Sequence, residues 1–165
     1  MIFATVGTQG QFDRLIRAID EWAGASGKTD IFAQTGQSDY RARYIRTERF
    51  LDATEFREHV EAASLVISHA GMGSIITALE LGKRLIVMPR LARFGEHRND
   101  HQLATAKRFG EQGAIMVAFT EQELVEKLDR LQSLSETERL TAPASPHLIS
   151  TIRAFIGGGV TASRK

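Results

Sequence analysis

Short apolar runs alternate with segments of helical spacing through most of this chain. The apolar runs predict buried strands at residues 2–6, 30–35, 65–68, 85–88 and 114–118, and a further short strand is expected within residues 38–50. Helices are expected at residues 12–27, 54–63, 74–81, 121–132 and 145–156, and from residue 100 to near Gly110 or Gly113. Because alternating strands and helices build βαβ units, the predicted fold class is α/β, a Rossmann-like parallel sheet with helices on both faces and right-handed crossovers.

The ends of these helices carry their own signals. Gly24 and Gly27 are expected to close the first helix, because glycine is favoured just past a helix end. Thr54 is the expected cap of the second helix. Thr120 and Glu123 have the spacing of a capping box and predict the start of the helix over residues 121–132.

Composition limits the classes of protein that fit. The 165 residues carry a net charge of +1 and no cysteine, so we predict no nucleic-acid partner, no disulfides and no cysteine-based chemistry. Neither a signal peptide nor a membrane span is expected, which predicts a soluble or peripheral chain. We expect one domain over residues 1–156, followed by a flexible glycine-rich tail at 157–165.

A glycine loop follows the strand at residues 65–68. His69 ends the apolar run, and Gly71, Met72, Gly73 and Ser74 lead into a helical segment. Backbone N–H groups at a helix N-terminus attract phosphate, and glycines let the anion approach closely, so a diphosphate seat is predicted here. The glycines could instead only permit tight helix–strand packing, and Ser74 could either cap the helix or also offer its hydroxyl to the anion.

Two further polar loops follow predicted strands, at residues 7–10 and 90–102. The carboxyl ends of parallel strands share one edge of the sheet, so all three loops are expected to converge there. Neither G-x-G-x-x-G nor the phosphate-loop pattern G-x-x-x-x-G-K-[ST] occurs, which disfavours an NAD enzyme or an NTPase. Gly7 and Thr8 could also form a plain strand-to-helix turn.

Several polar side chains in these loops suit recognition of a sugar or a phosphate. His69 could donate a hydrogen bond, act as a base, or be purely structural. Asn99, His101 and Gln102 could grip sugar hydroxyls, or this segment could simply cap a helix. His97 and His101 stand four residues apart, but the H-E-x-x-H pattern is absent, and we predict no metal site.

Four arginines, Arg41, Arg43, Arg46 and Arg49, could form a basic face. Such a cluster is usually a solvated surface. The alternative is contact with a partner or with an anionic membrane surface.

Three ordered motifs resemble the C-terminal half of a GT-B glycosyltransferase of family 28. These are FATVGT at residues 3–8, SHAGMGS at residues 68–74, and PRLARFGEH at residues 89–97 with DHQ at 100–102. The third resembles the bacterial exopolysaccharide members in particular, and the match covers residues 1 to about 130. The resemblance implies a single GT-B half that binds a UDP-sugar donor.

The resemblance also implies a role for each matching position. Gly7 and Thr8 would lie beside the donor phosphates. Gly71, Gly73 and Ser74 would cradle the diphosphate. His101 and Gln102 match the polar pair that touches the donor sugar. Met72 and Asn99 lie in the same loops and are predicted to bind the donor as well.

Recognition of the ribose is the point where this chain departs from the pattern. The single-chain relative holds the ribose with a glutamate one turn into the helix. Thr77 occupies the matching position here, and Glu80 follows three residues later.

The implied protein is the soluble donor-binding subunit of a two-component inverting glycosyltransferase, similar to the soluble subunit of the eukaryotic enzyme that adds N-acetylglucosamine to a dolichol-linked sugar. It would transfer a sugar from a UDP-sugar to a lipid-linked saccharide in exopolysaccharide or cell-surface glycan synthesis. A membrane-anchored glycosyltransferase subunit would bind the acceptor and recruit this cytoplasmic chain to the inner face of the membrane. No cofactor is expected, because the UDP-sugar is a substrate.

Three questions stay open at this point. The transferred sugar could be glucose, galactose, glucuronate or N-acetylglucosamine. The general base is expected from the partner, and His69 is the candidate within this chain. A non-catalytic nucleotide-binding or scaffold subunit is the alternative function, and a Rossmann-like oxidoreductase is a more distant one.

Overall fold

Six parallel strands form a single sheet in the order β3-β2-β1-β4-β5-β6. The computed structural model describes residues 1–111, 113 and 115–133. The strands are β1 (Ile2–Thr5), β2 (Ile31–Gln34), β3 (Arg46–Glu48), β4 (Leu65–His69), β5 (Leu85–Met88) and β6 (Met116–Val117). The order of the strands reverses between β1 and β4, which is the point where open α/β sheets bind their ligands.

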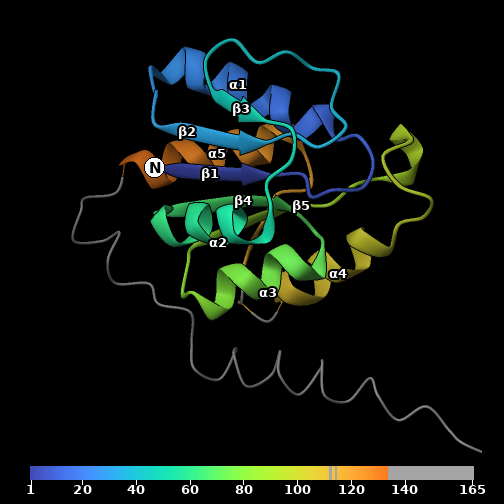
Figure 1. The fold of residues 1–165 in the computed structure, drawn as a ribbon. Coiled ribbons are helices and arrows are strands. Elements are labelled where there is room, and N and C mark those ends of the chain that lie inside the picture. The colour runs from blue at the N-terminus through green and yellow to red at the C-terminus, as the bar shows by residue number, and fades with distance from the viewer. Residues whose placement is uncertain (112, 114, 134–165) are drawn as a thin grey trace, which may run out of the picture.

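The helices cover both faces of this sheet (Figure 1). They are α1 (Asp13–Ser26), α2 (Ala53–Ala62), α3 (Met72–Glu80), α4 (His101–Glu111) and α5 (Glu121–Ser133), with a short 3₁₀ turn, η1 (Ala92–Phe94). α1 and α5 pack on one face, and α2, α3 and α4 pack on the other. The predicted fold class, an α/β Rossmann-like parallel sheet with helices on both faces, is therefore confirmed.

The strand sequences explain why both faces are covered. Along β1, the side chains of Ile2 and Ala4 join the core cluster beneath α1 and α5, whereas Phe3 joins the cluster beneath α2, α3 and α4. The same alternation holds in β4, where Ile67 and Val66 face opposite ways. A strand that is apolar on both sides needs a helix layer on each face.

The ends of three elements differ from the sequence prediction. Helix α1 continues through Gly24 and ends at Ser26. Gly27 caps it, as predicted, and its left-handed φ of 69° lets its N–H bond the Ala23 carbonyl. Helix α2 is capped by Asp52, not by Thr54, because the Asp52 carboxylate accepts the N–H groups of Thr54 and Glu55. Strand β6 is shorter than predicted.

The capping box predicted for α5 is formed only in part. Thr120 Oγ1 accepts the N–H of Glu123 at 3.1 Å, as expected. The carboxylate of Glu123 reaches back to the N–H of Phe119 at 2.9 Å, one residue before the cap. The predicted helix over residues 145–156 and the tail at 157–165 lie outside the described residues.

The arginine-rich segment at residues 38–50 is ordered by a buried carboxylate on α1. Asp20 accepts the backbone N–H groups of Arg43, Tyr44 and Ile45 and the hydroxyl of Tyr40, at 2.8–3.2 Å. These bonds hold the pKa of Asp20 below its usual range, although burial opposes them. All four arginines of this segment are exposed, which fits the solvated face, and contact with a membrane stays a hypothesis.

Candidate functional site

The three polar loops predicted to converge do so at the carboxyl edge of the sheet. Residues 7–10 follow β1, residues 70–71 separate β4 from α3, and residues 89–100 separate β5 from α4. The first and third loops are joined because the Arg90 guanidinium donates to the carbonyls of Val6, Gln9 and Gly10. The first and second loops meet at the ring of His69. The convergence lies at the reversal point between β1 and β4.

His69 fills the gap between two glycines. Gly7 has a φ of 74°, and a Cβ there would lie 2.6 Å from Cε1 of the His69 ring. A Cβ on Gly71 would overlap His69 Nε2. Both glycines are therefore required by the protein itself, because the imidazole occupies the space that their side chains would need.

The environment of His69 keeps its imidazole neutral. Burial, and then the positive charge of Arg90, lower the pKa of His69 from 6.5 to about 4, while a backbone hydrogen bond with Thr5 opposes them. Its Nδ1 atom is buried without a hydrogen-bond partner among the described residues. At neutral pH the ring is a weak base, so a hydrogen-bonding role fits it better than proton abstraction, and the catalytic role stays a prediction.

This lowered pKa predicts a specific dependence of stability on pH. Between pH 6.5 and 4 the unfolded chain binds a proton at His69 that the folded chain does not, so acid destabilises the fold in this window. Above pH 6.5 the contribution of His69 is fully retained. We expect the wild type to lose on the order of 3 kcal/mol more than a His69→Gln variant over this window. Urea unfolding from pH 4 to 7 measures the difference, and parallel curves would contradict the burial of His69.

Helix α3 presents its N-terminus to this edge of the sheet. Gly71 is the N-cap residue, in an extended conformation and without a side-chain cap hydrogen bond. The N–H groups of Met72, Gly73 and Ser74 belong to the first turn, which has no carbonyl partners within its own helix. An α-helix that starts without a side-chain cap leaves these donors and the positive end of its dipole available to an anion.

Ser74 is therefore not the cap that the sequence suggested. The helix begins two residues earlier, because Met72 and Gly73 are already helical and Ile75 N–H bonds the Gly71 carbonyl at 3.2 Å. The Ser74 side chain lies in the first turn and is buried. The Met72 side chain packs against the core beneath α3. Met72 can therefore contact a ligand through its backbone N–H group.

Gly73 differs from the other glycines of the site. It has no positive φ, and a Cβ built on it would meet nothing within 4 Å in the described structure. Nothing in the described fold requires glycine here, although glycine in a helix costs about 1 kcal/mol relative to alanine. The open space beside Gly73 is where an anion bound by the α3 N-terminus would lie.

The ribose candidates lie one turn further along α3. The Thr77 hydroxyl donates to the Gly73 carbonyl at 3.0 Å, on the half-exposed side of the helix. Glu80 is exposed in the last turn of the helix. Thr77 is thus the closer of the two to the glycine loop, and its hydroxyl oxygen keeps an acceptor lone pair.

The third loop divides into buried and exposed positions. Gln102 is buried, and its Oε1 accepts the N–H of Arg90 at 3.2 Å. Asn99 and His101 are exposed, and Asn99 Oδ1 accepts the N–H of His101 at 3.1 Å. Asp100 accepts the N–H of Ala92 at 2.9 Å. Asn99 thus bonds the first N–H group of α4, whereas the Asp100 carboxylate bonds the turn at Ala92 and not the helix.

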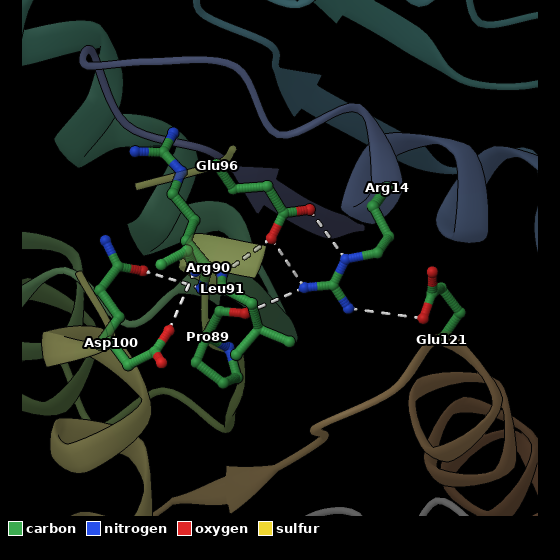
Figure 2. A network of polar contacts seen from close by, with 9 residues as sticks. Arg14, Pro89, Arg90, Leu91, Glu96, Asp100 and Glu121 are labelled. Atoms are coloured by element: carbon green, nitrogen blue, oxygen red, sulfur yellow. Dashed lines mark hydrogen bonds and ion pairs between the residues drawn. The ribbon is translucent and has the colours of Figure 1, made fainter. Parts of the chain in front are cut away.

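An ion-paired network behind this loop was not predicted from the sequence (Figure 2). The carboxylate of Glu96 receives two hydrogen bonds from Arg14 of α1, at 2.8 and 2.9 Å, and a third from the N–H of Leu91 at 2.9 Å. Arg14 also donates to the Pro89 carbonyl and, at 3.4 Å, to Glu121. The network fixes the turn after β5 against the start of α1.

A separate cavity of about 420 Å³ lies at the opposite, amino-terminal edge of the sheet. Its lining includes Ile2 and Leu65, which begin β1 and β4, Arg84, which directly precedes β5, and Leu128 of α5. None of the predicted site residues lines it. We therefore place the candidate site at the carboxyl edge, where the polar loops meet.

Two features are absent from the described residues. They contain no cluster of three or more His, Cys, Asp or Glu side chains that could hold a metal ion. No helix among them is long and apolar enough to cross a bilayer.

The fold and the site together define a class of protein. A doubly wound sheet of this strand order, with an uncapped helix N-terminus at the reversal point, is a Rossmann-like domain of the kind found in the C-terminal half of GT-B glycosyltransferases. The chain belongs to glycosyltransferase family 28, since the sequence model of the family's C-terminal domain, "Glycosyltransferase family 28 C-terminal domain", matches residues 1–152.

Curated relatives agree with this assignment. The UDP-N-acetylglucosamine transferase subunit ALG13 of Homo sapiens is 34% identical over 124 residues, which are 69% of this chain and 10% of that protein. The corresponding subunit of Mus musculus is 33% identical over 123 residues, with 68% and 10% covered. The chain thus spans about a tenth of the length of these relatives.

Solved structures show the same fold. The solution structure of ALG13 has a TM-score of 0.61 at 20% identity and covers 98% of this chain and 96% of its own. MurG of Acinetobacter baumannii has a TM-score of 0.54 at 22% identity, with 92% of this chain and 49% of its own covered.

Proposed function

We propose that this chain is the donor-binding subunit of a two-component inverting glycosyltransferase. It transfers a sugar from a UDP-sugar to a lipid-linked saccharide, in exopolysaccharide or cell-surface glycan synthesis. Family membership and the similarity to a subunit named UDP-N-acetylglucosamine transferase support the donor class.

The observation that carries this proposal is the uncapped N-terminus of α3 with open space beside Gly73. Met72, Gly73 and Ser74 direct their N–H groups at the diphosphate, and Gly7 and Thr8 form the facing wall after β1. Thr8 is exposed, and its hydroxyl is available to a phosphate oxygen. A diphosphate at this position interacts favourably with the α3 dipole.

The remaining donor groups have candidate partners further from the diphosphate. Thr77 binds a ribose hydroxyl through its own hydroxyl group. Asn99 and His101 are exposed at the start of α4 and contact the sugar, while the buried Gln102 acts mainly by holding the N–H of Arg90.

The proposed chemistry is a single displacement. An acceptor hydroxyl oxygen forms a bond to the anomeric carbon as the bond from that carbon to the UDP oxygen breaks, and UDP leaves with the electron pair. The first-turn N–H groups of α3 stabilise the negative charge that develops on the diphosphate. The acceptor proton passes to a base on the partner, because His69 with a pKa of about 4 is a weak base.

The acceptor half of the site is supplied by another chain in this proposal. In two solved glycosyltransferase structures with this fold, the matched part is 40% of the chain of the kitacinnamycin glycosyltransferase and 49% of the MurG chain. A membrane-anchored partner completes the site and recruits this chain to the inner face of the membrane.

A transfer assay tests this proposal. The isolated chain should bind UDP but transfer no sugar, and transfer should begin when its membrane-anchored partner subunit is added. If Gly73→Val abolishes that transfer, this chain holds the reacting donor. If transfer by the pair survives Gly73→Val, the chain is a scaffold or accessory nucleotide-binding subunit and the proposal is wrong.

A further inference from the structure

Arg90 connects the elements that surround the proposed donor site. Its guanidinium donates to the carbonyls of Val6, at 2.8 Å, and Gly10, at 3.2 Å, and also to that of Gln9, all in the chain that follows β1. Its backbone N–H donates to Gln102 at the start of α4. In Figure 2 the Arg90 side chain extends away from the Arg14–Glu96 pair. Arg90 therefore fixes the Gly7–Gly10 loop relative to β5.

Arg90 keeps its charge in a buried position without a carboxylate partner. It is 3% exposed and forms no ion pair with any described residue, and its Nε atom is buried without a hydrogen-bond partner there. The face of the Phe12 ring lies 5.5 Å from its guanidinium carbon. Burial lowers the pKa of Arg90, and Glu96 opposes this shift, but a guanidinium stays protonated in proteins. The contrast is Arg14, which Glu96 and Glu121 neutralise.

This charge acts on the pocket itself. The positive charge of Arg90 is one of the causes that lower the pKa of His69, whose ring lies between Gly7 and Gly71. An uncompensated buried cation costs free energy, and a bound anion nearby offsets that cost. The carbonyl oxygens and the aromatic face around Arg90 offset this free-energy cost only in part.

We propose that Arg90 is a positioning residue of the donor site, which clamps the Gly7–Gly10 loop and supplies the positive charge that selects a diphosphate over a neutral nucleoside. This inference rests on the proposed function, and it identifies Arg90 as one source of the selectivity of the donor site for a diphosphate. Arg90 acts through the loop and through its field, not by direct contact with the ligand.

The test compares a charged ligand with a neutral one. Calorimetric titration with UDP and with uridine gives the ratio of the two affinities for each variant. Arg90→Gln should reduce this ratio by about tenfold, because the variant loses a buried charge near the diphosphate. Arg90→Lys should lower the ratio less than Arg90→Gln does, since the ammonium group retains the charge but cannot reproduce the guanidinium bonds to the three carbonyls.

Arg93→Gln is the matched control, because it removes the same charge from an exposed position of the same loop. Screening by solvent should keep its ratio within about twofold of wild type. If Arg90→Gln and Arg93→Gln change the ratio equally, the inference is overturned while the proposed function stands. If the wild type does not bind UDP, the proposed function fails, and this inference fails with it.

A second readout needs no ligand. An NMR titration of the His69 ring should show a higher pKa in Arg90→Gln than in wild type, and little change in Arg90→Lys. If the role of Arg90 were purely structural, both variants would change the thermal stability. The pKa of His69 would then not differ between Arg90→Gln and Arg90→Lys. An unchanged His69 pKa in a folded Arg90→Gln variant would contradict the proposed placement of the charge.

Discussion

Replacing Gly73 by valine should weaken UDP binding strongly while the fold remains intact. A Cβ at residue 73 would meet no described atom within 4 Å, so a small side chain there extends toward the proposed ligand space. We expect a loss of about 100-fold in UDP affinity for valine and about tenfold for alanine, as N–H contacts to the diphosphate lengthen. The free energy of unfolding should change by less than about 1 kcal/mol, because both residues are tolerated in helices. Calorimetric titration and urea unfolding measure the two quantities.

Thr54→Val is the control for this variant. Thr54 occupies the same position in the first turn of α2, but there the N–H groups are already bound by the Asp52 carboxylate. A change at that helix should leave UDP affinity unaltered. Equal losses of affinity in Thr54→Val and Gly73→Val, or undiminished affinity in Gly73→Val, would contradict the assignment of the diphosphate to α3.

Glu96→Ala should be among the most destabilising single changes in the described fold. The substitution removes the carboxylate that pairs with Arg14 through two oxygens and leaves the N–H of Leu91 without its acceptor. The Arg14 and Glu96 side chains are only 11% and 9% exposed, so the remaining guanidinium stays largely buried. Breaking a buried pair on one side typically costs about 3–5 kcal/mol. Urea unfolding of the variant measures this loss.

Glu121→Ala provides the comparison on the same arginine. Glu121 lies 3.4 Å from Arg14 and is 49% exposed, so its removal should cost less than about 1 kcal/mol. Glu96→Gln should fall between the two, since an amide oxygen can still accept one of the hydrogen bonds. Similar losses for Glu96→Ala and Glu121→Ala would show that the network does not anchor the loop.

The local features of the fold were predictable from the sequence. Apolar runs that end at Gly7, His69 and Pro89 locate three strand ends, and the shared edge of a parallel sheet brings the following loops together. These inferences need only the spacing of apolar residues and the rules of βαβ connection. The start of α3 was placed two residues late, because glycines give a weak helix signal and the apolar spacing becomes visible only at Ile75.

Long-range polar contacts were not predictable in the same way. Arg90 bonds carbonyls 80 and 84 residues away, and Glu96 meets an arginine 82 residues away. Asp20 looked like a polar residue of an amphipathic helix, yet it is fully buried and orders the loop at residues 40–45. A single sequence shows which residues are charged, but the partner of each charge depends on the packing of elements that are distant in the chain.

The central claim is that a nucleoside diphosphate binds at the N-terminus of α3. Backbone amide NMR of the chain titrated with UDP tests it most directly, because each site contains different amides. We predict the largest shift changes at Met72, Gly73 and Ser74, with smaller changes at Gly7 and Thr8. Shift changes confined to the residues around the 420 Å³ cavity at the opposite edge, or no changes at millimolar UDP, would contradict the account.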